Sequence, residues 1–159
     1  MTTIHVMTPA DWARVRDLRL TALADTPDAF GSTLEREQSF VEAQWRQRLS
    51  SAVTFIAQLD DQDAGMVTGL ASEEPGTAFL VGMWVSPAHR GAGIGRQLIA
   101  QLISWAQAEG FGRISLEVGD SNASARRLYK SLGFEPTGRT GTLPPPRTHL
   151  LEHECELVL

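Results

Sequence analysis

Apolar residues recur along this chain with two different spacings, and the spacing separates helices from strands. Trp12, Val15, Leu18 and Ala22 follow one another at steps of three and four residues, which places them on one face of a helix. Thr8, followed by a proline and then by an acid at the third helical position, is typical of a helix start. The helical spacing predicts helices over residues 8–24, 40–49, 94–109 and 123–132.

Continuous or alternating apolar runs between turn residues predict strands. The longest run, residues 77–85, suggests a central strand, and Gly82 within it suggests a bulge. Pro144, Pro145 and Pro146 precede the last strand and form either a stiff polyproline arm or a wall of a substrate site. The predicted strands cover residues 4–7, 53–59, 66–72, 77–85, 113–118, 134–137 and 149–159.

Composition narrows the class of protein. With 159 residues and 42% hydrophobic content, residues 1–159 can form one domain with a full core. A net charge of −5 argues against a nucleic-acid or acidic-membrane partner, because both favour a basic face. The single cysteine, Cys155, excludes an internal disulfide, and no stretch of the sequence reads as a signal peptide or membrane span. We therefore expect a cytoplasmic protein.

A glycine-rich turn leads from the strand at 77–85 into the helix that begins near Ile94. Gly91, Gly93 and Gly95 would let the backbone approach a ligand, and the first amides of the helix would face an anion. A dinucleotide fingerprint does not fit, because Arg96 and Leu98 stand where its third glycine would be. A nucleoside-triphosphate loop does not fit either, because no Gly-Lys-Ser/Thr follows. The turn predicts a phosphate-binding site of another kind.

Two motifs carry a resemblance to a known family. Arg90-x-x-Gly93-x-Gly95 resembles the pyrophosphate-binding loop of the GCN5-related N-acetyltransferases (GNAT), whose ligand is acetyl-coenzyme A. Leu-Glu-Val at 116–118, followed by Asn122, Tyr129 and Gly133-Phe134, resembles the second signature of that family. Asn122 and Tyr129 are seven residues apart, close to two helical turns, so both can address one extended ligand.

The resemblance implies a fold and a cofactor site. The fold would be α/β (α+β), with a mixed, twisted sheet of about six to seven strands, split between the fourth and fifth, and about four flanking helices. The segment that matches Met83, Trp84 and Val85 pairs its backbone with the pantetheine arm as an added strand would. The implied residues that bind acetyl-coenzyme A are Met83, Trp84, Val85, Arg90, Gly91, Ala92, Gly93, Ile94, Gly95, Arg96 and Asn122.

Direct acetyl transfer to an amine needs a base for the amine and an acid for the leaving thiolate. The resemblance assigns the acid to Tyr129, and similarity to the ribosomal-protein alanine acetyltransferases assigns the base to Glu117. Both residues also have structural explanations: Tyr129 as a packed helix residue, and Glu117 as the partner of Arg126 or Arg127. Weaker candidates for binding the amine are Glu35, Glu37 and Glu73, each more often simply solvated. Neighbouring carboxylates disfavour a covalent route through Cys155.

The sequence therefore predicts an acetyl-coenzyme A-dependent N-acetyltransferase that acts on a primary amine of a small molecule, a protein N-terminus or a lysine. The alternative is a non-catalytic acyl-coenzyme A-binding sensor that uses the same cleft. We expect no metal, because His5, His89, His149 and His153 lack a recognised ligand spacing. A homodimer is possible. The identity of the acceptor amine is beyond the sequence.

Overall fold

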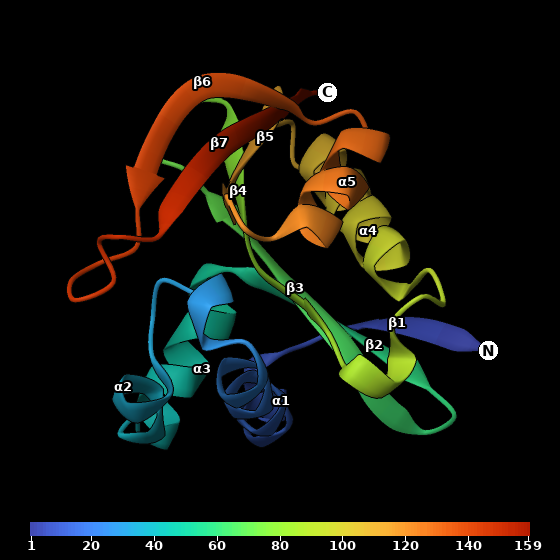
Figure 1. Cartoon of the computed structure of the whole chain (residues 1–159). Coiled ribbons are helices and arrows are strands. Elements are labelled where there is room, and N and C mark those ends of the chain that lie inside the picture. Colours follow the sequence, from blue (N-terminus) through green and yellow to red (C-terminus); the bar gives the residue numbers. More distant parts are fainter.

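The computed structural model covers residues 1–159 and contains one seven-stranded sheet (Figure 1). The strand order is β1-β2-β3-β4-β5-β7-β6, and every neighbouring pair is antiparallel except β4 and β5. The predicted mixed sheet is therefore confirmed. The strands are β1 (Thr2–Val6), β2 (Val53–Leu59), β3 (Gln62–Ala71), β4 (Thr77–Val85), β5 (Arg113–Gly119), β6 (Glu135–Thr142) and β7 (Leu151–Val158).

Helices cover both faces of the sheet, with α1 to α3 on one face and α4 and α5 on the other (Figure 1). Short 3-10 turns precede α1, α2 and α4. No helix is both long and apolar enough to cross a bilayer, and the cytoplasmic location stays a prediction. The helices are α1 (Trp12–Asp25), α2 (Leu34–Gln38), α3 (Glu42–Ser51), α4 (Ile94–Ala108) and α5 (Ala123–Ser131).

Strand alternation sends apolar side chains into two separate cores. In β2, Ile56 packs into the core beneath α1, whereas Phe55 and Ala57 pack into the core beneath α4. The apolar face of α4 is fully buried, and each buried leucine or isoleucine contributes roughly 1.5–3 kcal/mol. This burial fixes the position of the α4 N-terminus, where the glycine-rich turn ends.

Strands β4 and β5 separate part of the way along the sheet. Their parallel pairing is limited to Thr77–Phe79 against Arg113–Ser115, and it does not continue along β4. Gly82 has φ +62°, and the β3–β4 register shifts opposite it, which confirms the predicted bulge. The expected split in the sheet is therefore present, and it leaves one edge of the second half of β4 without a strand partner.

Several predicted boundaries differ from the structure. Strand β3 begins at Gln62, because Asp60 and Asp61 alone turn the chain, both with positive φ. Strand β6 continues to Thr142, rather than Thr137, because its pairing with β7 resumes after an irregularity. The largest omission is α2, a five-residue helix in a segment that lacks clear periodicity.

Glu37 in α2 corrects an expectation, because it is neither in a loop nor solvated. Its side chain is completely buried. Arg19 Nε and Nη2 donate to its two carboxylate oxygens at 2.9 and 3.1 Å, and Arg48 Nη1 donates to Oε1 at 2.9 Å. Burial by itself would raise the pKa of Glu37, but the hydrogen bonds and charge of Arg19, with Arg48, lower it to about 2. Glu37 therefore stays ionised and ties α1, α2 and α3 together.

We expect Glu37→Gln to lower the free energy of unfolding at pH 7 by about 3–5 kcal/mol, because it leaves two guanidinium groups without their anion. The folded pKa of Glu37 lies below its ordinary value of 4.5, so its stabilisation is complete above pH 4.5 and is lost as the pH falls towards 2. Urea unfolding from pH 7 to pH 3 measures this. The difference between wild type and variant should shrink below pH 4.5, and a constant difference would contradict the assignment. Glu35→Gln, on the exposed side of α2, is the control and should change stability by under about 0.5 kcal/mol.

Candidate functional site

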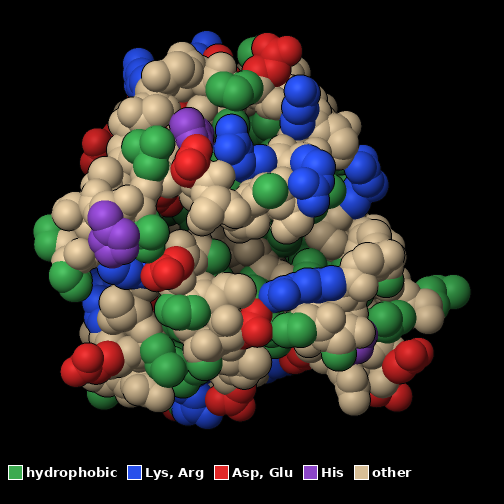
Figure 2. All heavy atoms as spheres, viewed as in Figure 1, with side chains coloured by type: hydrophobic (Ala, Val, Ile, Leu, Met, Phe, Trp, Pro, Cys, Tyr) green, Lys and Arg blue, Asp and Glu red, His purple; other side chains and the backbone are tan.

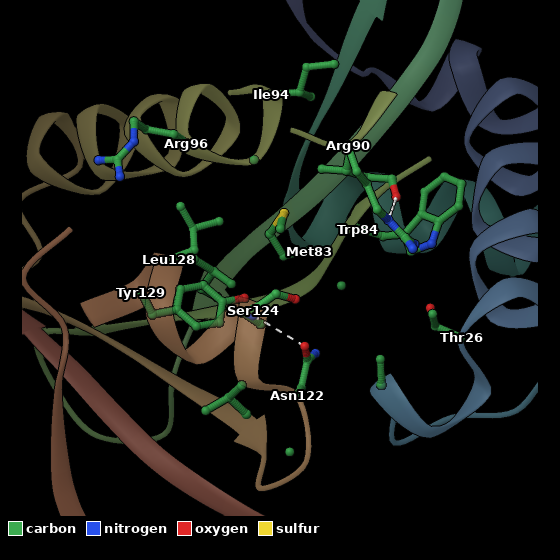
Figure 3. A pocket seen from close by; sticks show the side chains of 18 of the residues that line it. Thr26, Met83, Trp84, Arg90, Ile94, Arg96, Asn122, Ser124, Leu128 and Tyr129 are labelled. Atoms are coloured by element: carbon green, nitrogen blue, oxygen red, sulfur yellow. Dashed lines mark hydrogen bonds between the residues drawn. The ribbon is translucent and has the colours of Figure 1, made fainter. Parts of the chain in front are cut away.

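A cleft of about 490 Å³ lies where β4 and β5 separate. Figure 2 shows the hollow between the two halves of the molecule, and Figure 3 shows side chains from β4, α4 and α5 around it. The cleft is lined by every residue predicted to bind acetyl-coenzyme A or to act in catalysis, except Ala92. The weaker candidates for binding the amine, Glu35, Glu37 and Glu73, do not line it. Residues far apart in the sequence are thus brought to one surface by the split in the sheet.

The glycine-rich turn forms one end of this cleft. Gly91 and Gly93 have φ +83° and +80°, and a Cβ at either position would meet no atom within 4 Å. Gly93 is the N-cap of α4, and the first intrahelical bond is donated by Gln97. The amides of the first turn therefore lack carbonyl partners within the helix and can donate to an anion beside the positive end of the helix dipole.

Gly95 also has a packing role that the sequence did not indicate. A Cβ at Gly95 would lie 3.0 Å from Leu128 and 3.3 Å from Met83, so the missing side chain lets α4 pack closely on β4 and α5. Gly95 still lines the cleft, so its predicted part in binding the cosubstrate stays a prediction.

The open edge of β4 forms the floor of the cleft. Side chains of Met83 and Val85 pack with the core beneath α4, whereas Trp84 belongs to the core beneath α1. Trp84 Nε1 donates to Asp25 Oδ2 at 3.0 Å. The alternation leaves the backbone groups of this segment, rather than its side chains, along the split between β4 and β5.

Asp25, at the end of α1, does not line the cleft but bonds to two residues that do, a contact that the sequence did not indicate. Its Oδ2 also accepts a hydrogen bond of 2.8 Å from Arg90 Nη2, while Arg90 Nε donates to the Val85 carbonyl at 2.9 Å. Asp25 therefore connects α1, β4 and the glycine-rich turn. Arg90 uses two of its donor groups inside the protein, so its side chain positions the turn.

Helix α5 supplies the opposite wall. Asn122 Oδ1 caps the helix by accepting from the Ala125 amide at 3.3 Å, which leaves its amide donors free. Tyr129 is 7% exposed, and its ring meets the Phe134 ring edge-on at 5.7 Å between centroids. Burial, with a smaller contribution from Cys155, raises the pKa of Tyr129, so the hydroxyl keeps its proton at neutral pH.

Glu117 lies on the solvent-facing side of β5, while Leu116 and Val118 are buried, as the alternation predicted. It forms no ion pair with Arg126 or Arg127, and Arg126 instead lies 3.6 Å from Asp120. The structural explanation for Glu117 is therefore not observed. Carboxylates on β7 lie near it: burial and the negative charge of Glu117 raise the pKa of Glu152.

The thiol of Cys155 is buried in the core that contains Tyr129. Burial raises its pKa, and Glu154 adds to the effect while Arg126 opposes it. Because only the thiolate is a strong nucleophile, this environment supports the expectation that Cys155 carries no acyl group. The three prolines of the 144–146 segment do not line the cleft either.

Other residues that line the cleft were not among the predicted site residues. Ala125 and Leu128 follow Asn122 at helical spacing, and that periodicity could have found them. Thr26 and Ala29 come from the segment after α1, where no sequence signal marks them. Arg147 holds that segment by donating to the Pro27 carbonyl at 2.8 Å. No group of three or more His, Cys, Asp or Glu side chains is arranged to hold a metal.

Comparison with known proteins identifies the family. The family model described as acetyltransferase (GNAT) family matches residues 15–134. Aminoglycoside N(6')-acetyltransferase type 1 of Stenotrophomonas maltophilia is 30% identical over 146 residues, which cover 86% of this chain and 88% of that protein. Human N-acetyltransferase 8 is 29% identical over 90 residues, which cover 54% of this chain but only 40% of that protein.

Solved structures give the same fold over the whole chain. The ribosomal-protein-alanine N-acetyltransferase of Brucella melitensis has a TM-score of 0.75 at 23% identity and covers 99% of both chains. A protein of Salmonella typhimurium, solved with its cofactor acetyl-CoA, has a TM-score of 0.77 at 23% identity and covers 100% of this chain and 94% of that chain. Together with the cleft, the glycine-rich turn and the family-model match, these similarities show that the chain belongs to the acetyltransferase (GNAT) family.

Proposed function

We propose that this protein transfers an acetyl group from acetyl-coenzyme A directly to a primary amine. The observation that carries the proposal is the single cleft in which the unpaired amides of α4, the open edge of β4 and the hydroxyl-bearing Tyr129 meet. A cosubstrate in which a pantetheine arm joins a diphosphate to a thioester matches this order of groups. Family membership supports the same activity.

The lining residues fit acetyl-coenzyme A from its diphosphate to its thioester. The α4 amides would hold the diphosphate, where Gly91 and Gly93 leave room for close approach. The backbone of Met83 to Val85 would pair with the amides of the pantetheine arm, as a further strand would, and Asn122 has free amide donors beside it. Acetyl-coenzyme A supplies an acetyl group that is already activated as a thioester.

Two side chains would then handle protons. Glu117 would accept the proton of the attacking amine, which must be neutral to act as a nucleophile. Tyr129 would donate its hydroxyl proton to the leaving thiolate, and its raised pKa supports this role because the donor stays protonated. Cys155 takes no part in this direct route.

The first test is calorimetric titration of the protein with acetyl-coenzyme A, followed by a thiol-release assay over pools of small amines, lysine peptides and N-terminal peptides. We expect micromolar binding and thiol release that depends on an acceptor. Binding with no release from any pool would favour the acyl-coenzyme A sensor instead. An absence of binding would overturn the proposal.

Glu117→Gln should lower kcat by about 10²-fold while leaving acetyl-coenzyme A affinity unchanged, because only the proton acceptor is removed. The loss should be smaller at high pH, where more of the acceptor amine is already neutral. A pH profile of kcat/KM measures this. Glu73→Gln, in the turn before β4, is the control, and equal activity of both variants would remove Glu117 from the mechanism.

Asp25→Asn should raise the Kd for acetyl-coenzyme A by about tenfold with little change in kcat. The substitution keeps the size of the side chain but weakens the charge-assisted bond to Arg90 that positions the glycine-rich turn. Calorimetry and saturation kinetics separate the two effects. Asp17→Asn, on the exposed side of α1, is the control, and an unchanged Kd for Asp25→Asn would show that Asp25 does not position the turn.

A further inference from the structure

A second cavity, of about 240 Å³, lies beneath α1 and α3 and adjoins the first cleft at β4. Val81 and Gly82 line both spaces. These residues lie where β4 bulges, next to the segment proposed to hold the pantetheine arm. A molecule that fills this cavity can therefore extend towards the reacting end of the cleft.

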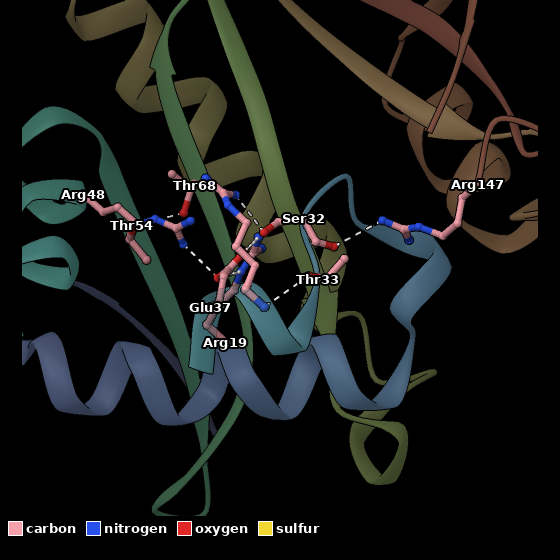
Figure 4. Close-up of polar contacts among 9 residues, drawn as sticks. Arg19, Ser32, Thr33, Glu37, Arg48, Thr54, Thr68 and Arg147 are labelled. Atoms are coloured by element: carbon pink, nitrogen blue, oxygen red, sulfur yellow. Dashed lines mark hydrogen bonds and ion pairs between the residues drawn. The ribbon is translucent and has the colours of Figure 1, made fainter. Parts of the chain in front are cut away.

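The charged residues that line the second cavity are both arginines. Arg19 comes from α1 and Arg48 from α3, and Figure 4 shows them around Glu37. Glu37 does not line the cavity, and its single negative charge balances only one of the two guanidinium groups. The cavity is therefore positive in a protein whose net charge is −5.

Both arginines keep donor groups that the protein does not use. Arg19 donates to Glu37 through Nε and Nη2, so its Nη1 has no partner. This Nη1 lies 3.0 Å from where a Cβ on Gly82 would be. Arg48 gives only Nη1 to Glu37, which leaves Nε and Nη2. The guanidinium of Arg48 also stacks on the Phe40 and Trp45 rings, 4.8 and 5.2 Å from their centroids. The ion pair with Glu37 and these two rings orient the guanidinium at the edge of the cavity.

Trp45 and three hydroxyl-bearing residues complete the lining of the cavity. The Trp45 side chain is 1% exposed, and its Nε1–H is closed off by the protein, so this donor is not offered to a ligand in the cavity. Ser51, Thr54 and Thr68 lie among the apolar lining residues. Two guanidinium groups with free donors, in a partly apolar cavity, are suited to a carboxylate.

We propose that the second cavity binds a carboxylate of the acceptor, so that the acceptor is a small amino acid rather than a simple amine. This inference rests on the proposed acetyl transfer. The carboxylate would lie against Arg48 and Arg19, and the amine would extend past Gly82 towards Glu117. The positive Arg19 and Arg48 on one side of Gly82 and the negative Glu117 on the other would thus align a zwitterion across β4.

The test is the thiol-release assay with a series of amino acids in which one to five carbons separate the amine from the carboxylate. Each acid is compared with its own carboxamide, which has nearly the same shape but no negative charge. At the matching spacing, kcat/KM for the acid should exceed that for the amide by about tenfold or more. Equal rates for acid and amide at every spacing would overturn the proposal, as would peptide amides that react faster than every acid.

Arg48→Met should lower kcat/KM for the preferred acid by about tenfold and leave that for its amide unchanged, while Arg48→Lys restores part of the preference. Arg46→Met, on the exposed side of α3, is the matched control. An equal loss for acid and amide would mean that Arg48 is structural and would contradict the proposal. Thermal unfolding of each variant checks that the fold survives, since Arg19 still pairs with Glu37.

Calorimetry separates this inference from the proposed function. The protein, saturated with coenzyme A, is titrated with the N-acetylated acid and with its N-acetylated amide. Tighter binding of the acid, lost in Arg48→Met, would support the carboxylate site even if no acceptor released thiol, in which case acetyl transfer alone would fail. Equal binding of both compounds would overturn the carboxylate site while leaving acetyl transfer standing.

Discussion

Tyr129→Phe should lower kcat by about 10²-fold or more and leave the Kd for acetyl-coenzyme A within about twofold. The substitution removes only the hydroxyl, and the phenylalanine ring can keep the edge-on contact with Phe134. Burial raises the pKa of Tyr129 further above neutral pH, so the wild-type hydroxyl is protonated under assay conditions. Without it the thiolate must leave unprotonated or take its proton from water.

Saturation kinetics and calorimetry on the same preparation measure the two quantities, and thermal unfolding shows whether the core around Tyr129 has changed. Tyr129 is the only tyrosine of the chain, so no other tyrosine can replace it. Its loss should also be insensitive to the acceptor, because the leaving group is the same for all of them. A normal kcat would remove Tyr129 from the mechanism and favour its interpretation as a packed core residue.

Gly93→Asp should raise the Kd for acetyl-coenzyme A by about 10²-fold or more. Gly93 is the N-cap of α4 with φ +80°, in open space, so an aspartate there would place a carboxylate where the diphosphate is expected. Aspartate tolerates the left-handed region better than most residues and is a good N-cap. The loss should therefore reflect charge and bulk at the site rather than unfolding.

Gly93→Asn provides the matched comparison, because asparagine has nearly the same shape and the same tolerance of positive φ but no charge. We expect it to weaken binding by about tenfold, less than the aspartate. Calorimetry at two salt concentrations measures the difference, which should shrink at high salt because screening weakens charge repulsion. Normal binding by Gly93→Asp would show that the diphosphate does not lie at the α4 N-terminus.

The sequence was most informative where structure depends on neighbouring residues. Helical spacing located α1, α4 and α5, and alternation placed Glu117 opposite the buried face of β5. Gly91 and Gly93 lie in a turn as predicted, with positive φ values that suit glycine, and Asn122 caps its helix. These features follow from backbone sterics and local hydrogen bonds, which a short segment carries by itself.

Features that depend on distant partners could not be predicted. Asp25 reads as a helix-ending residue in the sequence, yet it binds Trp84 and Arg90, which lie 59 and 65 positions away. Glu37 reads as a solvated acid, and only the packing of α1 and α3 against α2 makes it a buried anion. Gly95 reads as part of a phosphate loop, and only the approach of Leu128 and Met83 shows why a side chain is excluded.

The sequence by itself thus determined most of the elements, the glycine-rich turn and the two motifs of the family, because periodicity and turn chemistry are local. Tertiary structure alone decided how far β4 and β5 separate, which residues beyond the motifs line the cleft, and that a second, positive cavity adjoins it at Gly82. The physical reason is that cavities, buried ion pairs and shared walls are properties of packed surfaces, to which each segment contributes only one side.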